Sequence, residues 1–496
     1  MELDAPLEAE LRAQDSRAVL VSGFSEYRKN SAEAVQAARR ARVDLDYENQ
    51  EGIRDVLSAV RDRAPLIFVS GRAGTGKSRL IEYLRGLPDG ERQVVVAPTG
   101  VSALALKAST IHAMFRLPIG VIDAESLRLD DPPAGPLLRK MSRLVIDEVG
   151  MVRADLLDGI DVRLQAARAD DRPFGGVQVV LVGDFLQLPP VVRDEDREIL
   201  ERLGYETPFA FSSRVMRRTP VRIATLRKVW RQSDPAMIAA LGAIREGRNA
   251  QQAIEWLNER CAREHRANAS PVILTATRVA AEMYNREGLS ALSPGGESAP
   301  GLRSAMFQAS SAGSFDDLQS VLPAPRQLEL ICGARVMAVR NDPTGSFVNG
   351  SLGLVVDIFD GAGLFEDAYV DVLFDGALCA VRVRPADWSR VKQVWDSQAG
   401  AIVETTTGVF RQIPLMIGYA MTIHKSQGLS LADVRIDLAK GAFAPGQLYV
   451  ALSRARSVEG LSFVRPIELR DVKVDEMLVS FLDWTRSAEN IEIGNP

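Results

Sequence analysis

The chain has 496 residues, of which 46% are hydrophobic and 25% are charged, and its formal net charge is -5. This composition excludes long disordered, collagen-like and coiled-coil chains, and the length predicts about three globular units. The acidic balance excludes a uniformly basic coat for nucleic acid. It permits a local basic track, because charges farther apart than about 8 Å are screened at physiological salt.

The compartment is indicated by the cysteines and the N-terminal sequence. Cys261, Cys332 and Cys379 form no CxxC pair, so neither a disulfide framework nor a zinc site is expected. The first residues are acidic, unlike a signal peptide, and no apolar run approaches the length of about 18 residues that spans a bilayer. We therefore expect a cytoplasmic protein of a bacterial-type cytosol or nucleoid, without a membrane partner.

The pattern along the chain predicts an α/β fold. Residues 1–45 are rich in Ala, Glu and Arg and predict a helical N-terminal extension. Over residues 46–215, continuous runs of Val, Ile and Leu alternate with helical stretches, as in a parallel sheet covered by helices on both faces. The predicted strands of this first domain are 66–71, 93–98, 143–148 and 177–184.

A second α/β domain is predicted over residues 216–480, followed by a C-terminal tail at 481–496. Between about 346 and 413, short strands separated by DG turns predict an inserted small β-barrel. The predicted strands of the second domain are 222–226, 271–277, 334–340, 414–424 and 461–467.

Residues 71–78 read GRAGTGKS, a full GxxxxGK[ST] match between a predicted strand and a predicted helix. Gly74, Thr75 and Gly76 let backbone N–H groups surround phosphate oxygens at a helix N-terminus, where the helix dipole favours anions. Lys77 is expected to reach the β- and γ-phosphates, and the hydroxyl of Ser78 is expected to ligate Mg²⁺. This motif predicts a nucleotide-binding loop.

Three polar residues at strand ends predict hydrolysis of the bound nucleotide. Asp147 and Glu148 follow a buried strand, where the first is expected to hold Mg²⁺ and the second to orient the attacking water. Gln187 ends the next strand and is placed as a sensor of the γ-phosphate. Alternatively, this segment is a loop in which Pro189 and Pro190 simply stop the strand.

Two arginines are candidates for stabilising charge in the transition state. Arg231 lies in WRQSD and Arg454 in YVALSRARS. Such arginine fingers increase the rate by about 10³–10⁵. The alternative for any single arginine is a solvated face or a surface ion pair.

Two of the three histidines lie in identical triplets, Thr110–His112 and Thr422–His424. Together with Lys425 and Ser426, they supply neutral and cationic groups for phosphate contacts, as expected if one nucleic-acid strand crosses both domains. The alternative for each triplet is a histidine that caps a helix. Aromatic stacking of bases is a further prediction for Phe115 and Phe185, and burial in the core is its alternative.

Nine ordered strings resemble superfamily 1 helicases of the 5'-to-3' branch that contains the Pif (petite integration frequency) and RecD-type helicases. They are GRAGTGKS, APTGVSALAL, STIHAMF, LVIDEVGM, GDFLQLPPV, WRQSD, NGSLGLV, TIHKSQGLS and YVALSRARS, and the resemblance covers residues 48–470. It implies two RecA-like P-loop domains, a small wedge at about 117–136 and a barrel of the Src-homology-3 type at about 346–413.

The same resemblance implies that Mg-ATP hydrolysis drives 5'-to-3' movement on single-stranded DNA and unwinding of fork or tailed duplexes. The expected setting is replication, recombination, repair or the maintenance of telomeres and quadruplexes, with single-stranded-DNA-binding or repair proteins as partners. Two alternatives remain open. One is a RecD-like motor subunit of a larger repair complex, and the other is a nucleotide-gated switch that binds single-stranded DNA.

The resemblance also implies roles for individual residues. Gln50 is expected at the adenine, although it stands farther from the P-loop than the family pattern has it, and Gly428 is expected beside the nucleotide. The catalytic set implied is Lys77, Glu148, Gln187, Arg231 and Arg454. The DNA-binding set predicted here is Pro98, Thr99, Thr110, His112, Phe115, Phe185, Thr422, His424, Lys425 and Ser426.

Overall fold

The computed structural model describes residues 47–87, 92–118, 120–129, 136–261, 271–292, 303–316, 322–361, 367–396, 398 and 401–487. The predicted N-terminal extension lies outside these residues, as do 488–496 of the predicted tail. Part of the predicted wedge, at 119 and 130–135, lies outside them too. The helix that precedes the first sheet is α2 (Glu51–Arg61).

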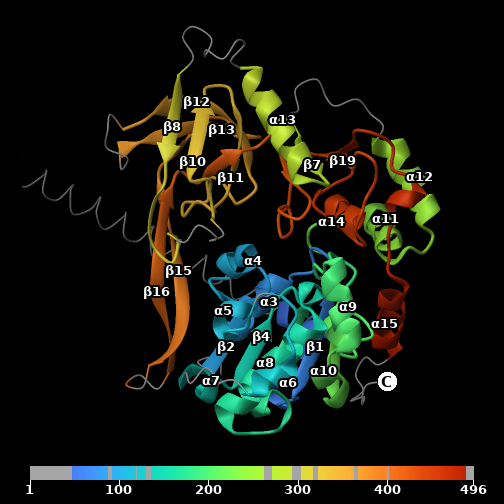
Figure 1. Ribbon diagram of the computed structural model, residues 1–496. Coiled ribbons are helices and arrows are strands. Elements are labelled where there is room, and N and C mark those ends of the chain that lie inside the picture. Colours follow the sequence, from blue (N-terminus) through green and yellow to red (C-terminus); the bar gives the residue numbers. More distant parts are fainter. Residues whose placement is uncertain are drawn as a thin grey trace, which may run out of the picture. The chain divides into compact units, whose positions relative to one another are not determined.

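Six parallel strands form the first sheet, in the order β3-β2-β4-β5-β1-β6. Three of them, β1, β2 and β4, are labelled in Figure 1. Strands β1, β2, β4 and β5 are buried along their whole length, because continuous apolar runs need cover on both faces of a sheet. The bounds are β1 (Leu66–Gly71), β2 (Gln93–Ala97), β3 (Ser109–Thr110), β4 (Arg143–Ile146), β5 (Gln178–Gly183) and β6 (Val221–Leu226).

Helices follow most of these strands, and α8 is buried along nearly its whole length against the first core. The phosphate-loop motif falls between β1 and α3, as the sequence pattern predicts. The helices of this domain are α3 (Lys77–Arg85), α4 (Gly100–Ala105), α5 (Ile111–Phe115), α6 (Ala124–Leu129), α7 (Pro136–Lys140), α8 (Ala154–Arg168), α9 (Asp194–Arg202) and α10 (Arg214–Arg218).

The predicted domain boundary at 215/216 is wrong, because β6 pairs in parallel with β1 and completes the first sheet. Val221 lies opposite Leu66, and Leu226 lies opposite Gly71. An apolar run of this kind fits the edge of either sheet, so the pattern alone does not assign it.

The second sheet is also parallel, in the order β18-β7-β19-β20. β19 lies in a stretch for which no strand is predicted. The bounds are β7 (Val272–Thr275), β18 (Ala420–Thr422), β19 (Val434–Asp437) and β20 (Leu461–Phe463), with helices α11 (Pro235–Glu246), α12 (Ala250–Cys261), α13 (Arg278–Ser290) and α14 (Gln447–Leu452).

The insertion between α13 and β18 consists of antiparallel sheets, with the orders β14-β13-β12-β11-β17, β15-β16-β9 and β10-β8. The strand order does not show whether these sheets close into a barrel, so the Src-homology-3-type barrel stays a prediction. The bounds are β8 (Ser304–Gln308), β9 (Ser310–Gly313), β10 (Gln327–Ile331), β11 (Arg335–Ala338), β12 (Leu352–Phe359), β13 (Tyr369–Phe374), β14 (Val381–Val383), β15 (Ala386–Asp396), β16 (Ala401–Gln412) and β17 (Leu415–Ile417).

Two predicted strands of the second sheet are therefore corrected. The run at 334–340 forms β11 of the insertion, and the run at 414–424 divides into β17 and β18. The division falls at Gly418, where a Cβ would lie 2.7 Å from the carbonyl carbon of Val336. The chain passes β11 too closely there for any side chain, and it then enters the second sheet.

The C-terminal helix α15 (Glu476–Ser487) belongs to the first core, so the predicted boundary at 480/481 cuts through a helix. Leu478 is buried in the first core, and the ring of Phe481 stacks on that of Phe211 with the centroids 4.3 Å apart. The chain thus leaves the first domain after β6 and returns to it at α15, which is labelled in Figure 1.

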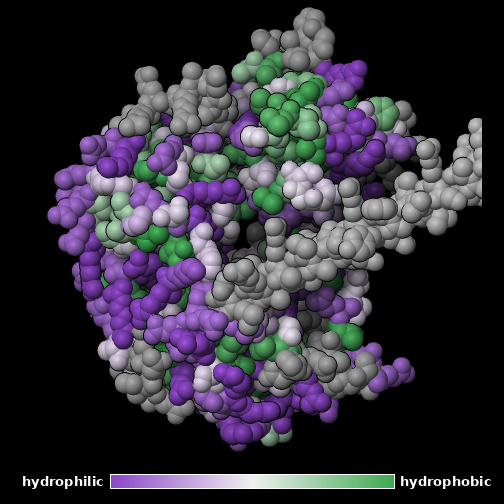
Figure 2. Space-filling view, turned by 180° about the vertical axis from the view of Figure 1, so that it is seen from behind, coloured by the Kyte–Doolittle hydropathy of each residue, from purple (hydrophilic) through white to green (hydrophobic). Residues whose placement is uncertain are grey.

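The described helices include none that is both long enough and apolar enough to cross a bilayer. The face drawn in Figure 2 is largely hydrophilic where it is coloured, with apolar residues gathered in smaller patches.

Candidate nucleotide and nucleic-acid sites

The phosphate loop takes a compact turn between β1 and α3. Gly74 and Gly76 have φ angles of 79° and 90°, a region that L side chains rarely adopt. The Nζ of Lys77 donates to the carbonyl oxygens of Gly71 at 2.8 Å and Arg72 at 3.1 Å. The hydroxyl of Thr75 donates to the carbonyl of Arg72 at 2.9 Å. The side chain of Lys77 therefore folds back over the phosphate loop.

Burial lowers the pKa of Lys77 below its ordinary value, against the field of three carboxylates, those of Asp184, Glu148 and Asp147. Burial also raises the pKa of Asp147 to about 7, with the charge of Glu148 as the next cause. Two neighbouring carboxylates repel one another, and a nearby cation relieves that repulsion. The end of β4 is thus a place where positive charge is stabilised.

Glu148 adopts a strained backbone conformation at the start of the turn after β4. Its φ of 50° and ψ of 45° lie in the left-handed region, which is unfavourable for a non-glycine residue. Such outliers persist only where the surrounding structure enforces them, and they are frequent in active sites.

A buried ion pair joins the two domains next to the predicted γ-phosphate sensor. Asp184 follows β5, and Arg245 of α11 donates to it at 2.7 Å. Burial alone would raise the pKa of Asp184, but Arg245 holds it below its ordinary value. Gln187 is buried, and its Nε2 donates to Asp184 at 3.4 Å. Asp184 thus connects Gln187 to the second domain.

The two candidate arginine fingers are held by the second domain. Arg231 donates from Nε to Ser430 at 2.7 Å, and from Nη1 to the Ser453 carbonyl at 3.0 Å. Its Nη2 donates to the carbonyl of Gly428 at 3.4 Å. Gly428, predicted beside the nucleotide, therefore lies against Arg231.

Arg454 is fully buried, and its Nε donates to the carbonyl of Val450 at 2.9 Å. Burial, and then the nearby charge of Arg231, lower its pKa to about 9, and Glu148 opposes this effect. Arg454 therefore lies within electrostatic range of both Arg231 and Glu148. The structure brings together the predicted lysine, the carboxylate pair and both arginines.

The predicted Mg²⁺ site offers hard oxygen donors. Mg²⁺ is usually held by one or two carboxylates together with phosphates and water rather than by a full protein cage. Ser78 is exposed at the start of α3, and Asp147 is buried beside Glu148. The described ranges contain no cluster of three His, Cys, Asp or Glu side chains that could hold a metal ion. The hydroxyl of Ser78 and the carboxylate of Asp147 are oxygen donors of the kind that Mg²⁺ prefers.

Gln50 immediately precedes α2, and its backbone N–H donates to the carbonyl of Tyr47 at 3.2 Å. Its contact with adenine stays a prediction.

The first predicted DNA segment follows β2 and β3. Thr99 and Thr110 cap α4 and α5, where their hydroxyls accept from the N–H groups of Ser102 and Ala113 at 3.2 and 3.4 Å. Pro98 precedes the first of these caps and is partly exposed. His112 is half-buried, and burial lowers its pKa.

The second predicted DNA segment follows β18 in the second domain. Thr422 accepts from the N–H of Lys425 at 3.3 Å, and the side chains of His424 and Lys425 are exposed. Ser426 is fully buried, and its hydroxyl donates to the carbonyl of Ile423 at 2.7 Å. Its side chain therefore caps a turn and is closed off from solvent, so this conformation does not offer it to DNA.

The predicted stacking role of two phenylalanines is wrong. Phe115 is fully buried in the first core, and Phe185 is 5% exposed within an aromatic cluster. Neither ring has a face open to a base. A different aromatic ring is exposed beside the second predicted DNA segment. Phe443 is 58% exposed, and its ring lies nearly parallel to that of His424, with the centroids 6.4 Å apart.

Comparisons with known proteins agree with this arrangement. A family model described as PIF1-like helicase matches residues 45–259. The ATP-dependent DNA helicase PIF1 of Mus musculus is 33% identical over 446 residues, which are 86% of this chain and 61% of that relative. The crystal structure of Bacteroides sp Pif1 in complex with ADP-AlF4 is 31% identical, with a TM-score of 0.77 over 88% of this chain and 97% of the other. This chain belongs to the Pif1 helicase family.

A further solved structure, Bacteroides Pif1 bound to ssDNA, is 32% identical, with a TM-score of 0.61 over 88% of this chain and 97% of the other. Membership of the Pif1 family confirms the resemblance inferred from the nine strings and the α/β fold with a RecA-like, parallel-sheet core. The chain spans 61% of the length of its mouse Pif1 relative.

Three residues beside the predicted sites of this Pif1-family chain, Asp184, Arg245 and Phe443, are not among those predicted from the sequence. Asp184 stands in GDFLQLPPV, and its position beside Gln187 was a usable signal. Its partner Arg245 lies 61 residues away in a helix without a motif. Phe443 likewise lies outside every matched string, and only its exposure beside His424 reveals it.

Proposed function

We propose that this chain is an ATP-dependent DNA helicase that moves 5' to 3' along single-stranded DNA. The observation that carries the proposal is the convergence of Lys77 and Glu148 of the first domain with Arg231 and Arg454 of the second. A site built from two domains links hydrolysis to their relative position, as a motor requires.

The roles follow from charge and position. Lys77 neutralises the β- and γ-phosphates, Glu148 orients the attacking water, and Gln187 contacts the γ-phosphate. Arg231 and Arg454 stabilise the charge that develops on the transferred phosphoryl group. Gln50 and Gly428 are proposed at the base and beside the nucleotide.

Mg²⁺, when bound, neutralises phosphate charge, and Ser78 and Asp147 would hold it. Removal of the metal with a chelator is expected to abolish hydrolysis, measured as phosphate release. Hydrolysis that persists in excess chelator would contradict this assignment.

DNA is the proposed track because two polar segments follow the ends of parallel strands, a partly exposed one in the first domain and an exposed one in the second. Ligands of α/β sheets bind at the carboxyl ends of the strands. The structural relative bound to ssDNA supports the same ligand. Contacts are proposed for Pro98, Thr99, Thr110, His112, Thr422, His424 and Lys425.

We propose fork and tailed duplexes as substrates, in replication, recombination, repair or quadruplex maintenance. The polarity is tested by comparing unwinding of duplexes with a 5' tail and with a 3' tail at the same salt concentration. Opening of the 5'-tailed duplex alone is expected. Opening of the 3'-tailed duplex alone would overturn the polarity and leave the nucleotide site unaffected.

The chemical assignment is tested with Lys77→Ala and Glu148→Gln. Both variants are expected to lose DNA-stimulated ATP hydrolysis, by at least about 10²-fold, because each removes a group that acts in the transition state. Glu148→Gln should still bind ATP, since it leaves the phosphate loop intact. Phosphate release and nucleotide titration measure the two properties, and full turnover by either variant would contradict the assignment.

A further inference from the structure

Side chains of the second domain bond to two adjacent residues at the start of the phosphate loop, Arg72 and Ala73. The Nη2 of Arg72 donates to Oε1 of Glu246 at 3.3 Å. The N–H of Ala73 donates to the buried hydroxyl of Tyr449 at 2.9 Å. The conformation of the loop entry therefore depends on α11 and α14 of the second domain.

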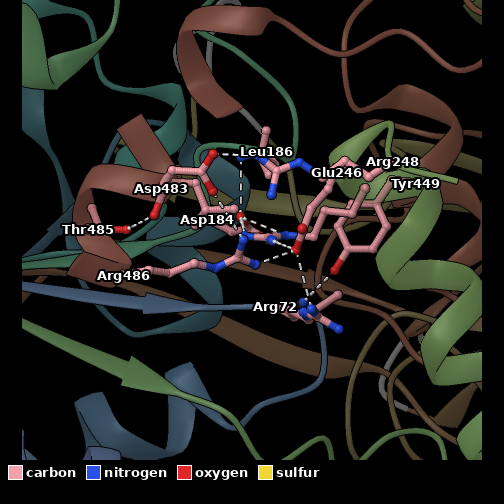
Figure 3. Close-up of polar contacts among 12 residues, drawn as sticks. Arg72, Asp184, Leu186, Glu246, Arg248, Tyr449, Asp483, Thr485 and Arg486 are labelled. Atoms are coloured by element: carbon pink, nitrogen blue, oxygen red, sulfur yellow. Dashed lines mark hydrogen bonds and ion pairs between the residues drawn. The ribbon is translucent and has the colours of Figure 1, made fainter. Parts of the chain in front are cut away.

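Glu246 joins three segments through a single carboxylate oxygen (Figure 3). Its Oε1 accepts from Arg72 of the phosphate loop at 3.3 Å, from Arg245 of its own helix at 3.4 Å and from Arg486 of α15 at 2.7 Å. The carboxylate is 11% exposed, and the side chains of Arg72 and Arg486 are 36% and 39% exposed. Hydrogen bonds between charged groups of this kind are stronger than those between neutral groups.

Arg486 stands on a helix that is fixed in place. Phe481 of α15 packs in the aromatic cluster of the first domain, and Asp483 pairs with Arg248 directly after α11. Glu246 of the second domain is thus held between two arginines of the first domain, one on the loop and one on α15.

A glycine in α11 makes room for the loop arginine. A Cβ at Gly242 would lie 2.8 Å from Nη1 of Arg72. Glycine inside a helix costs about 1 kcal/mol relative to alanine. Here the glycine allows the helix to approach the guanidinium closely enough for Glu246 to reach it.

We propose that Glu246 is a positioning residue for nucleotide binding, and that it couples the phosphate loop to α15 through Arg72 and Arg486. The inference rests on the proposed ATP-dependent function of the same loop. Nucleotide affinity then depends on how α15 is docked, although α15 contributes no residue to the predicted phosphate contacts.

Three substitutions test this coupling. Glu246→Gln removes the shared charge, Arg486→Ala removes the contact from α15, and Gly242→Ala displaces Arg72 while favouring the helix. Each is expected to raise the Kd for Mg-ADP, and the KM for ATP, by about fivefold, the size of a typical coupling between contacting groups. The double variant of Glu246 and Arg486 should be no worse than Glu246→Gln alone, because both changes break one connection.

The matched control is Glu206→Gln, the same change at a surface ion pair with Arg217 in which the glutamate is 67% exposed. It should leave both constants unchanged. Gly242→Ala separates positioning from stability, because it should weaken nucleotide binding without lowering the melting temperature. Arg486 is 39% exposed, so Arg486→Ala should fold even if Glu246→Gln does not.

The outcomes separate this inference from the proposed function. If Arg486→Ala and Gly242→Ala bound Mg-ADP with the wild-type Kd, the inference would be overturned. An equal increase of the Kd in the control Glu206→Gln would overturn it as well. A wild-type chain that binds Mg-ADP without hydrolysing ATP would contradict the proposed function, and the Kd comparison would still decide the role of Glu246.

Discussion

Phe443 and Phe185 both lie near predicted DNA segments, but their surroundings give them different roles. Phe185 contacts Phe68, Phe209 and Phe481 and stabilises the first core. Phe443 presents its ring to solvent beside His424. An exposed ring beside a nucleic-acid track provides a surface on which a base stacks.

At this scale we expect Phe443→Ala to weaken binding of a single-stranded oligonucleotide by about 1–3 kcal/mol, the contribution of one stacked base. Phe443→Trp keeps a planar ring and should retain the affinity. Fluorescence anisotropy of a labelled oligonucleotide measures both. Equal affinity of the alanine variant and the wild type would assign the ring to another role.

At the scale of elements, α15 is the helix by which the chain returns to the first domain. Its inner face packs Leu478 and Phe481 into the first core, while Met477 is 46% exposed. Its docking thus depends on apolar contacts, with ion pairs at Asp483 and Arg486 added at the edge.

Phe481→Ala is therefore expected to lower the free energy of unfolding by about 2–4 kcal/mol, because it leaves a cavity in the aromatic cluster. Met477→Ala on the same helix is the control, and a surface change of this kind is usually within about 0.5 kcal/mol. Chemical denaturation provides the comparison. If the two variants were equally stable, the helix would not be docked through Phe481.

At the scale of the whole molecule, the net charge of -5 excludes a uniformly basic surface, so we expect the ionic contacts with DNA to be local. Lys425 is an exposed cation of the second predicted segment, and the neighbouring groups are neutral hydroxyls and histidines. A motor must release DNA at each step, and each ionic contact with a phosphate strengthens its binding to DNA. A small number of such contacts therefore suits a motor.

We expect the logarithm of the single-stranded DNA association constant to fall with the logarithm of salt concentration with a slope of about -2 to -4, which corresponds to roughly three to six phosphate contacts. Binding titrations at several salt concentrations measure this slope. A slope steeper than about -7 would indicate an extended basic surface instead.

Local patterns predicted the local features well. The phosphate loop and the Asp147–Glu148 pair lie at strand ends because the strand, the loop and the following turn are encoded within a few residues. The sheet to which an apolar run belongs is not local information. For that reason β6 was expected in the second domain, and the run at 414–424 was expected to be one strand.

Contacts between distant residues had no signal in the chain. Arg72 and Glu246 are 174 residues apart, and Arg486 is 240 residues from Glu246. For an aromatic residue inside a motif, the sequence leaves stacking and burial both open, and packing places Phe115 and Phe185 in the core. A motif identifies the segment that acts, but only packing decides which of its side chains face outward.

The return of α15 to the first core has a consequence for how the chain is made. During synthesis, β6 completes the first sheet long before Leu478 and Phe481 leave the ribosome. Until then the aromatic cluster around Phe185 lacks its cover, and contacts so distant along the chain form slowly. While the second domain is translated, the nascent first domain therefore exposes an aggregation-prone apolar surface. Binding of a chaperone would protect the chain most during that interval.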